Sequence, residues 1–299
     1  MGVTLTYPGI HTEEQIAAWK EVTHAVHEQG SYIYLQLWAL GRAANPPYLK
    51  SSGYDLVSSS DVPMKSTFSD EMHYPRPLTE KEILGAVEDF TTAAGNAIAA
   101  GFDGVEIHGA NGYLVDQFIQ DVLNRRTDAW GGSIERRSRF ALDVTRAVAD
   151  AVGNDRTAIR LSPWSRYQGM RMSDPIPQFA DLVVRLADFK LAYLHACESE
   201  AKKSTDSLRF LLDAYKRAGP VILAGNYDGE SARKVVDETY EDNDLLVAFG
   251  RPYISNPDLV YRVQEGIPFS PLDPATMYAQ TSEGYIDYEF CKKFQAKLK

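Results

Sequence analysis

The segment His-Gly-Ala-Asn-Gly-Tyr, residues 108–113, combines three side chains that can act on one carbonyl compound. The imidazole of His108 and the carboxamide of Asn111 are three residues apart across a glycine-containing turn, so both can reach one oxygen atom. Two such donors stabilise negative charge that develops on a carbonyl oxygen. The phenol of Tyr113 can deliver a proton as a general acid. We therefore take these three as candidate catalytic residues; the alternative is a strand-end histidine with backbone partners, a turn asparagine and a packed tyrosine.

Glu106 lies two positions before His108, on the same face of a predicted strand. A carboxylate and an imidazole placed in this way could begin a metal site. The sequence has no third ligand with matching spacing, and Glu106 could equally pair with Arg160. We therefore expect no metal.

Two glycine-containing segments follow the last two predicted strands, Ala224-Gly225-Asn226 and Phe249-Gly250-Arg251. Glycine lets the backbone approach a ligand closely, and arginine supplies a fixed cation. In barrels the loops after the last two strands often hold a phosphate. The alternative is two ordinary turns and a solvated arginine. No G-x-G-x-x-G and no Walker loop is present, so a dinucleotide bound in the Rossmann manner is not expected.

Short apolar strands alternate with helices along the chain. Strands are predicted at 31–37, 104–108, 158–161, 191–195, 221–224 and 245–249, and helices at 12–29, 79–100, 138–152, 176–189, 207–218 and 229–240. Strands that alternate with helices pair in parallel through right-handed crossovers. The pattern therefore predicts an α/β fold, either an open doubly wound sheet or a closed barrel.

In both architectures ligands bind at the carboxyl ends of the strands. Polar and aromatic side chains are concentrated there, which favours a small-molecule site. They are Gln36, Trp38, His108, Asn111, Tyr113, Arg160, Asn226 and Arg251.

No linker divides the 299 residues, which we take as one domain, 1–299, with an insertion at about 43–76. The chain has 31 Lys and Arg against 41 Asp and Glu, and the net charge of −10 disfavours nucleic-acid binding. No apolar run of membrane-spanning length is present. Two cysteines, Cys197 and Cys291, and no secretory signal favour a reducing compartment, so we expect a cytoplasmic protein.

The sequence resembles the Old Yellow Enzyme family from about Pro8 to Tyr288. The segments His-Gly-Ala-Asn-Gly-Tyr and Gly-Arg-x-x-Ile-Ser-Asn-Pro-Asp are together highly specific for that family. The matching segments follow the family's order: 36–42, 104–114, 124–128, 131–133, 160–163, 250–259 and 284–288.

The resemblance implies an FMN-containing (β/α)8 TIM barrel. Such an enzyme uses NADPH or NADH to reduce the carbon–carbon double bond of α,β-unsaturated carbonyl compounds. By the same resemblance, His108 and Asn111 bind the carbonyl oxygen of the substrate, and hydride comes from flavin N5. Tyr113 then protonates the other alkene carbon.

The resemblance also implies which residues hold the cofactor and line the pocket. Gln36 and Arg160 resemble residues that contact the flavin ring. The FMN phosphate is expected at a glycine-rich pair of loops, and two aromatic side chains are expected to line the substrate pocket. The phosphate residues are Gly225, Asn226, Gly250 and Arg251, and the pocket residues are Trp38 and Tyr285.

The chain departs from the family pattern near its N-terminus. Six strands are predicted, whereas the family's barrel has eight, and each strand–helix unit needs about 30 residues. We therefore expect a barrel truncated to about six strands. Three functions stay open: an ene-reductase, a catalytically impaired or inactive truncated barrel that binds FMN poorly, and an enone isomerase using the same pocket. The particular enone, the choice between NADPH and NADH, and the oligomeric state are not predicted.

Overall fold

The computed structural model describes residues 8–65, 71–199, 205–277 and 281–298. The chain divides into two compact units, Met1–Val221 and Ile222–Lys299. The single domain expected from the sequence stays a prediction. Within the described ranges, no helix is both long and apolar enough to cross a bilayer.

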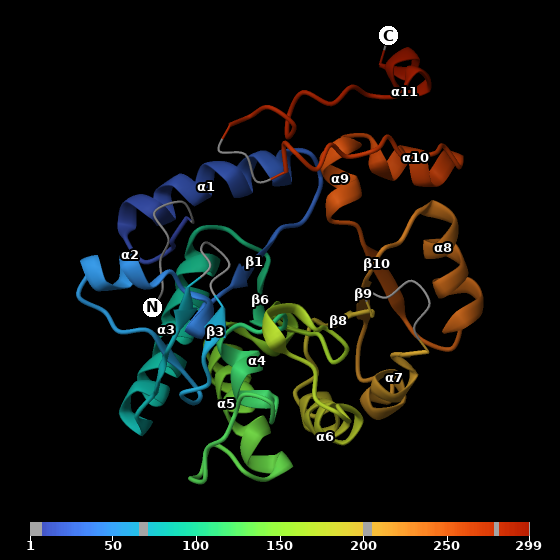
Figure 1. The fold of residues 1–299 in the computed structure, drawn as a ribbon. Helices are drawn as coiled ribbons and strands as arrows, with labels where there is room; N and C mark the ends of the chain where they lie inside the picture. The colour runs from blue at the N-terminus through green and yellow to red at the C-terminus, as the bar shows by residue number, and fades with distance from the viewer. Residues whose placement is uncertain (1–7, 66–70, 200–204, 278–280, 299) are drawn as a thin grey trace. The chain divides into compact units, whose positions relative to one another are not determined.

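Parallel strands form the main sheet of the first unit, in the order in which they occur in the chain (Figure 1). In register, Gln36 pairs with Glu106, His108 pairs with Arg160, and Arg160 pairs with His195. The predicted parallel pairing is therefore confirmed. The strands are β1 (Tyr34–Leu37), β6 (Gly104–Gly109), β7 (Thr157–Leu161) and β8 (Tyr193–Cys197).

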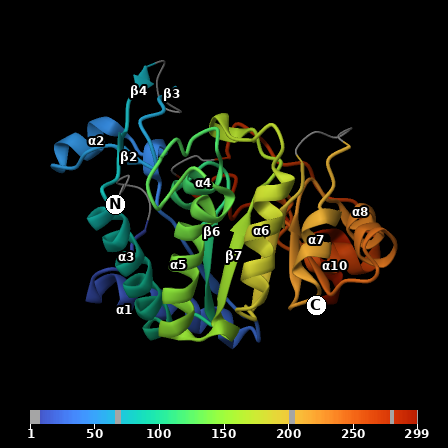
Figure 2. The same ribbon diagram turned by 90° about the horizontal axis from the view of Figure 1, so that it is seen from below.

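Alternation along these strands separates a polar face from an apolar face. Ile107, Ile159 and Leu161 are fully buried, and they alternate with Glu106, His108 and Arg160. Three helices pack beside the sheet: α3 contacts β1 and β6, α5 contacts β6 and β7, and α6 packs on α5 (Figure 2). The apolar residues therefore supply the core beneath the helices, and the polar residues point to the opposite face. These helices are α3 (Glu80–Ala99), α5 (Ile134–Val152) and α6 (Ile176–Ala187).

Side-chain caps set where the helices begin. Thr12 and Thr79 close capping boxes at the starts of α1 (Glu13–Glu28) and α3, which confirms the expected starts. Helix α5 begins four residues before the predicted Ser138, because the Ser133 side chain caps it. Strand β8 is shifted by two residues toward the C-terminus from the predicted range 191–195, since its pairing with β7 begins at Tyr193.

The insertion at 43–76 contains short elements of its own. Strand β2 pairs in parallel with β5, and β3 pairs antiparallel with β4. Leu40, Ala44 and Leu49 form a small apolar cluster, against which Trp38 and Tyr113 pack. The elements are η1 (Gly41–Ala43), α2 (Pro46–Ser51), β2 (Val57–Ser58), β3 (Met64–Lys65), β4 (Met72–His73) and β5 (Arg76–Pro77).

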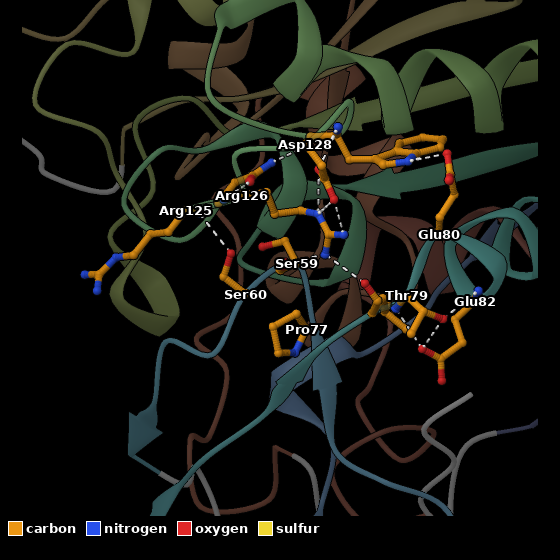
Figure 3. Close-up of polar contacts among 12 residues, drawn as sticks. Ser59, Ser60, Pro77, Thr79, Glu80, Glu82, Arg125, Arg126 and Asp128 are labelled. Carbon is orange, nitrogen blue, oxygen red and sulfur yellow. Dashed lines mark hydrogen bonds and ion pairs between the residues drawn. The ribbon is translucent and has the colours of Figure 1, made fainter.

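Arg126, in the loop before α5, ties the insertion to the rest of the first unit (Figure 3). Its guanidinium donates to the carbonyl oxygens of Ser59 (3.0 Å) and Leu78 (2.8 Å) and forms an ion pair with Asp128 (2.6 Å). The neighbouring backbone N–H of Arg125 donates to Ser60 Oγ, at 2.9 Å. This segment, part of the family resemblance, therefore stabilises the fold.

The remaining elements of the first unit are short: α4 (Leu114–Ile119), η2 (Asn154–Arg156), η3 (Tyr167–Gly169) and α7 (Arg209–Tyr215). The second unit contains two neighbouring strands with helices around them. They are β9 (Val221–Ala224), α8 (Gly229–Lys234), η4 (Val235–Thr239, a short π-helix), β10 (Leu245–Ala248), α9 (Arg251–Ser255), α10 (Leu259–Glu265) and α11 (Lys292–Lys297).

Two side chains of the Ile-Ser-Asn-Pro-Asp segment hold the second unit together. Asn256 is fully buried, and its Oδ1 accepts from the backbone N–H of Ser270 at 2.7 Å. Asp258 forms a buried ion pair with Arg262 (2.7 Å) and accepts from the N–H of Cys291 (2.8 Å). These contacts attach the C-terminal segment to α9 and α10.

Phe118 offers a test of the core of the first unit. Its side chain is fully buried, and its ring centroid lies 4.5 Å from that of Phe140. We expect Phe118→Ala to lower the free energy of unfolding by about 3–5 kcal/mol in urea denaturation, because it leaves a cavity. The exposed Tyr32 is the control: Tyr32→Ala should change stability by less than about 0.5 kcal/mol. Equal losses in both variants would contradict this placement of the core.

Candidate active site

Two of the three predicted catalytic side chains lie in contact at the carboxyl end of β6. The ring centroids of His108 and Tyr113 are 4.9 Å apart. The Trp38 ring, which follows β1, lies 4.8 Å from that of Tyr113 and 6.2 Å from that of His108. His108 is buried, and the other two are partly buried. The first unit therefore brings a phenol, an imidazole and an indole ring into one cluster.

A tight turn places the third predicted catalytic residue, Asn111. Asn111 and Gly112 both have left-handed backbone conformations, with φ of 57° and 76°. The N–H of Asn111 donates to Ser162 Oγ, beyond the end of β7, at 2.8 Å. A Cβ at Gly112 would lie 2.8 Å from Met170 Cγ, so this position requires glycine. The turn reverses the chain directly after β6 and returns Tyr113 to the cluster.

His108 is held in its neutral form. Burial, together with the positive charge of Arg160, lowers the pKa of His108 to about 3. Its Nδ1 is buried and has no hydrogen-bond partner within the described part of the chain. Buried polar atoms are usually hydrogen-bonded, so this atom is available to a ligand. A neutral imidazole can donate one hydrogen bond, which suits a carbonyl oxygen.

Glu106 is the centre of a buried polar network on the face of the sheet that also carries His108. Its Oε1 accepts from Gln36 Nε2 at 2.6 Å, and its Oε2 pairs with His195 Nδ1 at 2.8 Å. Burial raises the pKa of Glu106, but His195, Gln36 and Arg160 together hold it below its ordinary value. The sequence suggested Arg160 as a partner of Glu106. Arg160 acts on Glu106 through its charge, whereas the hydrogen-bonded partners are Gln36 and His195. No group of three His, Cys, Asp or Glu side chains in the described ranges is arranged to hold a metal ion.

The residues around this network fit a flavin ring. Arg160 Nε is a second buried polar atom without a hydrogen-bond partner among the described residues. Gln36 is exposed on the edge strand β1. A flavin ring presents carbonyl oxygens and ring nitrogens, and it needs donors such as an amide and a guanidinium. Cys197, at the end of β8, lies beside Arg160, and burial raises the pKa of its thiol.

The second unit carries the residues predicted to hold a phosphate. Gly225 and Asn226 follow β9 directly, and Gly250 and Arg251 form the start of α9 after β10. All four are exposed, and a Cβ at Gly250 would meet no atom within 4 Å. Tyr285, predicted to line the substrate pocket, is also exposed. The roles of these five residues stay predictions.

Helix α4 contains two buried polar residues that the sequence did not single out. Asp116 Oδ2 accepts from the N–H of Gly112 at 2.9 Å, and Gln117 Nε2 donates to the carbonyl oxygen of Gly112 at 2.7 Å. Asp116 also accepts from Gln120 Nε2 at 2.9 Å, and burial raises the pKa of Asp116 to about 7. Two adjacent polar residues on an otherwise apolar helix directly after the motif are the signal that could have identified them.

Known proteins resemble this chain over most of its length. The model of the NADH:flavin oxidoreductase / NADH oxidase family matches residues 2–270. Chanoclavine-I aldehyde reductase fgaOx3 of Penicillium roqueforti is 57% identical over 298 residues, which cover 97% of this chain and 80% of that protein. The probable inactive dehydrogenase easA of Claviceps fusiformis is 50% identical, covering 96% of this chain and 78% of its own length.

Solved structures agree with these relatives. Morphinone reductase has a TM-score of 0.85 at 38% identity and covers 95% of this chain and 79% of its own. The Old Yellow Enzyme from a Pichia species has a TM-score of 0.88 at 35% identity and covers 97% of this chain and 78% of its own. The fold and these matches define a flavin-dependent oxidoreductase with a TIM-barrel fold. The chain belongs to the NADH:flavin oxidoreductase / NADH oxidase family, of the Old Yellow Enzyme type, and its cofactors are FMN and a nicotinamide reductant.

Asp116 makes the free energy of unfolding depend on pH, and the substitution Asp116→Asn isolates this contribution. Its pKa is 3.8 as a free side chain and about 7 when folded, so folding favours the protonated form. This contribution to stability is fully present below the unfolded pKa and is lost as the pH rises through the folded pKa. We therefore expect the free energy of unfolding of the wild type, minus that of Asp116→Asn, to fall between about pH 4.5 and about pH 7.5.

Urea denaturation at each pH measures this difference. The lowered pKa of His108 gives a dependence of opposite sign, stability being lost as the pH falls below the ordinary histidine value. Because both proteins contain His108, that contribution cancels in the difference. A difference that does not vary with pH would show that Asp116 is ionised throughout.

Proposed function

We propose that this chain is an ene-reductase, which reduces the carbon–carbon double bond of an α,β-unsaturated carbonyl compound with NADPH or NADH through FMN. The observation that supports it best is the contact between the phenol ring of Tyr113 and the buried, neutral imidazole of His108. A carbonyl-binding donor and a proton donor thereby lie side by side at the end of one strand. Family membership supplies the cofactor that such a pair requires.

His108 and Asn111 act on the carbonyl group. Their N–H groups donate to the carbonyl oxygen, withdraw electron density from the conjugated alkene and stabilise the negative charge that develops on that oxygen. FMN, when bound, supplies the hydride that adds to the alkene carbon β to the carbonyl. Tyr113 donates its phenolic proton to the α carbon, and its phenolate regains a proton from solvent. The product is the saturated carbonyl compound.

The other predicted residues would bind FMN and enclose the substrate. Gln36 and Arg160 would hold the flavin ring, and the fixed charge of Arg160 favours negative charge on it. Glu106 orients the amide of Gln36 through the 2.6 Å hydrogen bond. The FMN phosphate would lie at the exposed loops of the second unit, and two aromatic residues would enclose the substrate. These are Gly225, Asn226, Gly250 and Arg251 for the phosphate, and Trp38 and Tyr285 for the substrate.

The relatives favour an aldehyde as the activating carbonyl group. The printed name of fgaOx3 is that of an aldehyde reductase, so we propose an α,β-unsaturated aldehyde as the substrate. The name of the Claviceps relative, a probable inactive dehydrogenase, corresponds to the alternative of an impaired barrel. His108, Asn111 and Tyr113 are all present here, which favours an active enzyme. A cytoplasmic location remains part of the proposal.

The activity can be tested with trans-2-hexenal and excess NADPH under anaerobic conditions, with FMN added. We expect one NADPH oxidised for each hexanal formed. An isomerised product without net NADPH consumption would establish the isomerase instead. A protein that stays colourless after FMN is added would establish the barrel that does not bind its cofactor.

Tyr113→Phe tests the proton donor. We expect kcat for alkene reduction to fall by about 100-fold or more, since positioned general acids contribute that much. FMN content and the binding of phenol ligands should not change, because the ring remains. Tyr54→Phe, at an exposed tyrosine of the insertion, is the matched control and should keep full activity. Equal turnover by wild type and Tyr113→Phe would remove Tyr113 from the mechanism.

Arg251→Met tests the phosphate site. We expect the dissociation constant of FMN to rise about 10- to 100-fold, as for the loss of one charge-assisted hydrogen bond. Riboflavin lacks the phosphate, so its affinity should be the same for wild type and variant. Fluorescence titration measures both ligands. If riboflavin binding weakens as much as FMN binding, Arg251 does not contact the phosphate.

A further inference from the structure

The side chain of Gln117 uses its full hydrogen-bonding capacity inside the first unit. It is completely buried. Its Oε1 accepts from the backbone N–H of Arg42 (3.2 Å) and from Ser58 Oγ (2.9 Å). Its Nε2 donates to the carbonyl oxygens of Leu40 (3.1 Å) and Gly112 (2.7 Å). A primary amide has two N–H donors and two acceptor lone pairs, and all of them are matched here.

The partners of Gln117 belong to segments far apart in the sequence. Ser58 lies in β2 of the insertion, and Leu40 and Arg42 lie at the entrance to the insertion. Gly112 lies in the turn between His108 and Tyr113. Close packing reinforces the connection, because a Cβ at Gly41 would collide with the Gln117 amide. In addition, Ser59 Oγ donates to the backbone carbonyl oxygen of Gln117 at 2.6 Å.

The same turn touches the insertion through apolar contacts. Tyr113 and Trp38 pack on the cluster of Leu40, Ala44 and Leu49. The turn therefore contacts the insertion in two ways. Gln117 bonds to the Gly112 backbone, and the Tyr113 ring packs on the apolar cluster.

The turn needs such support because of its backbone. Two consecutive residues, Asn111 and Gly112, are in the left-handed region, which a non-glycine residue such as Asn111 enters at an energetic cost. The carbonyl of Gly112 is held by Gln117, and its N–H is held by Asp116. With both peptide groups fixed, the direction in which Tyr113 leaves the turn is set by α4 and by whatever α4 contacts.

We propose that Gln117 is a positioning residue that couples the insertion to the catalytic turn, so that the insertion at 43–76 sets the position of the Tyr113 proton donor. The catalytic consequence rests on the proposed function. The coupling itself is a property of the fold and can be measured without any reaction.

Amide hydrogen exchange tests the coupling first. Ser58→Ala removes one hydrogen bond from the insertion side of Gln117 and leaves the turn intact. We expect faster exchange, by about 5-fold or more, in peptides covering 108–114, which lie some 50 positions away in the sequence. Ser52→Ala, at an exposed serine of the same insertion, is the matched control and should leave that segment unchanged. Faster exchange confined to residues near 58 would overturn the coupling.

A double-mutant cycle tests the catalytic consequence. We expect Gln117→Met to lower kcat for alkene reduction about 10- to 100-fold with little change in KM, because a displaced proton donor affects the chemical step. FMN content and the rate of flavin reduction by NADPH should stay at wild-type values. In the Tyr113→Phe background the same substitution should have no further effect, since the group it positions is gone.

The outcomes separate the two proposals. Equal losses from Gln117→Met in both backgrounds, or a parallel loss of FMN, would make Gln117 a general structural residue and overturn its positioning role. If Gln117→Met does not fold, Ser58→Ala with Tyr113→Phe gives the same cycle with a milder change. Absence of alkene reduction in the wild type would overturn the proposed function alone, and the exchange experiment would still decide the coupling.

Discussion

In-register parallel pairing is the constraint on which the first unit depends. Because alternate residues of a strand face the same way, β1, β6, β7 and β8 present their polar residues on one face and their apolar residues to the helices. Charged groups on a buried face must find partners. Glu106 does so through Gln36 and His195, whereas His108 and Arg160 retain buried atoms that the described protein groups do not satisfy. The register of the sheet thus gathers these buried polar side chains on one face.

The turn at 111–112 shows how a short segment acquires a defined shape. The left-handed conformation of Asn111, a non-glycine residue, would be costly in an isolated peptide. Ser162, Asp116 and Gln117 bind the backbone on either side and offset that cost. These partners come from a neighbouring strand end and from the following helix. The turn is therefore as rigid as the elements around it, which suits residues that must hold a fixed geometry.

The family motifs contain residues of two kinds. His108 and Tyr113 lie in the ring cluster, and their side chains suit the proposed reduction of an alkene conjugated to a carbonyl group. Arg126 and Asn256, in contrast, hold loops and chain segments by hydrogen bonds to backbone carbonyls and N–H groups. Only the first kind has a proposed role in the reaction, and the second kind stabilises the fold.

The sequence by itself determined the α/β alternation, the capped starts of helices such as α1 and α3, and the motif at 108–113, because these depend on local periodicity and on caps within one turn. Tertiary structure alone decided that Glu106 pairs with His195 and that Gln117 connects the insertion to the turn at 111–112. Local patterns show that a residue is polar and buried, but not which group from a distant segment meets it. That choice depends on how strands and helices pack, since the partners of Glu106 and Gln117 lie about 60 to 90 positions away in the chain.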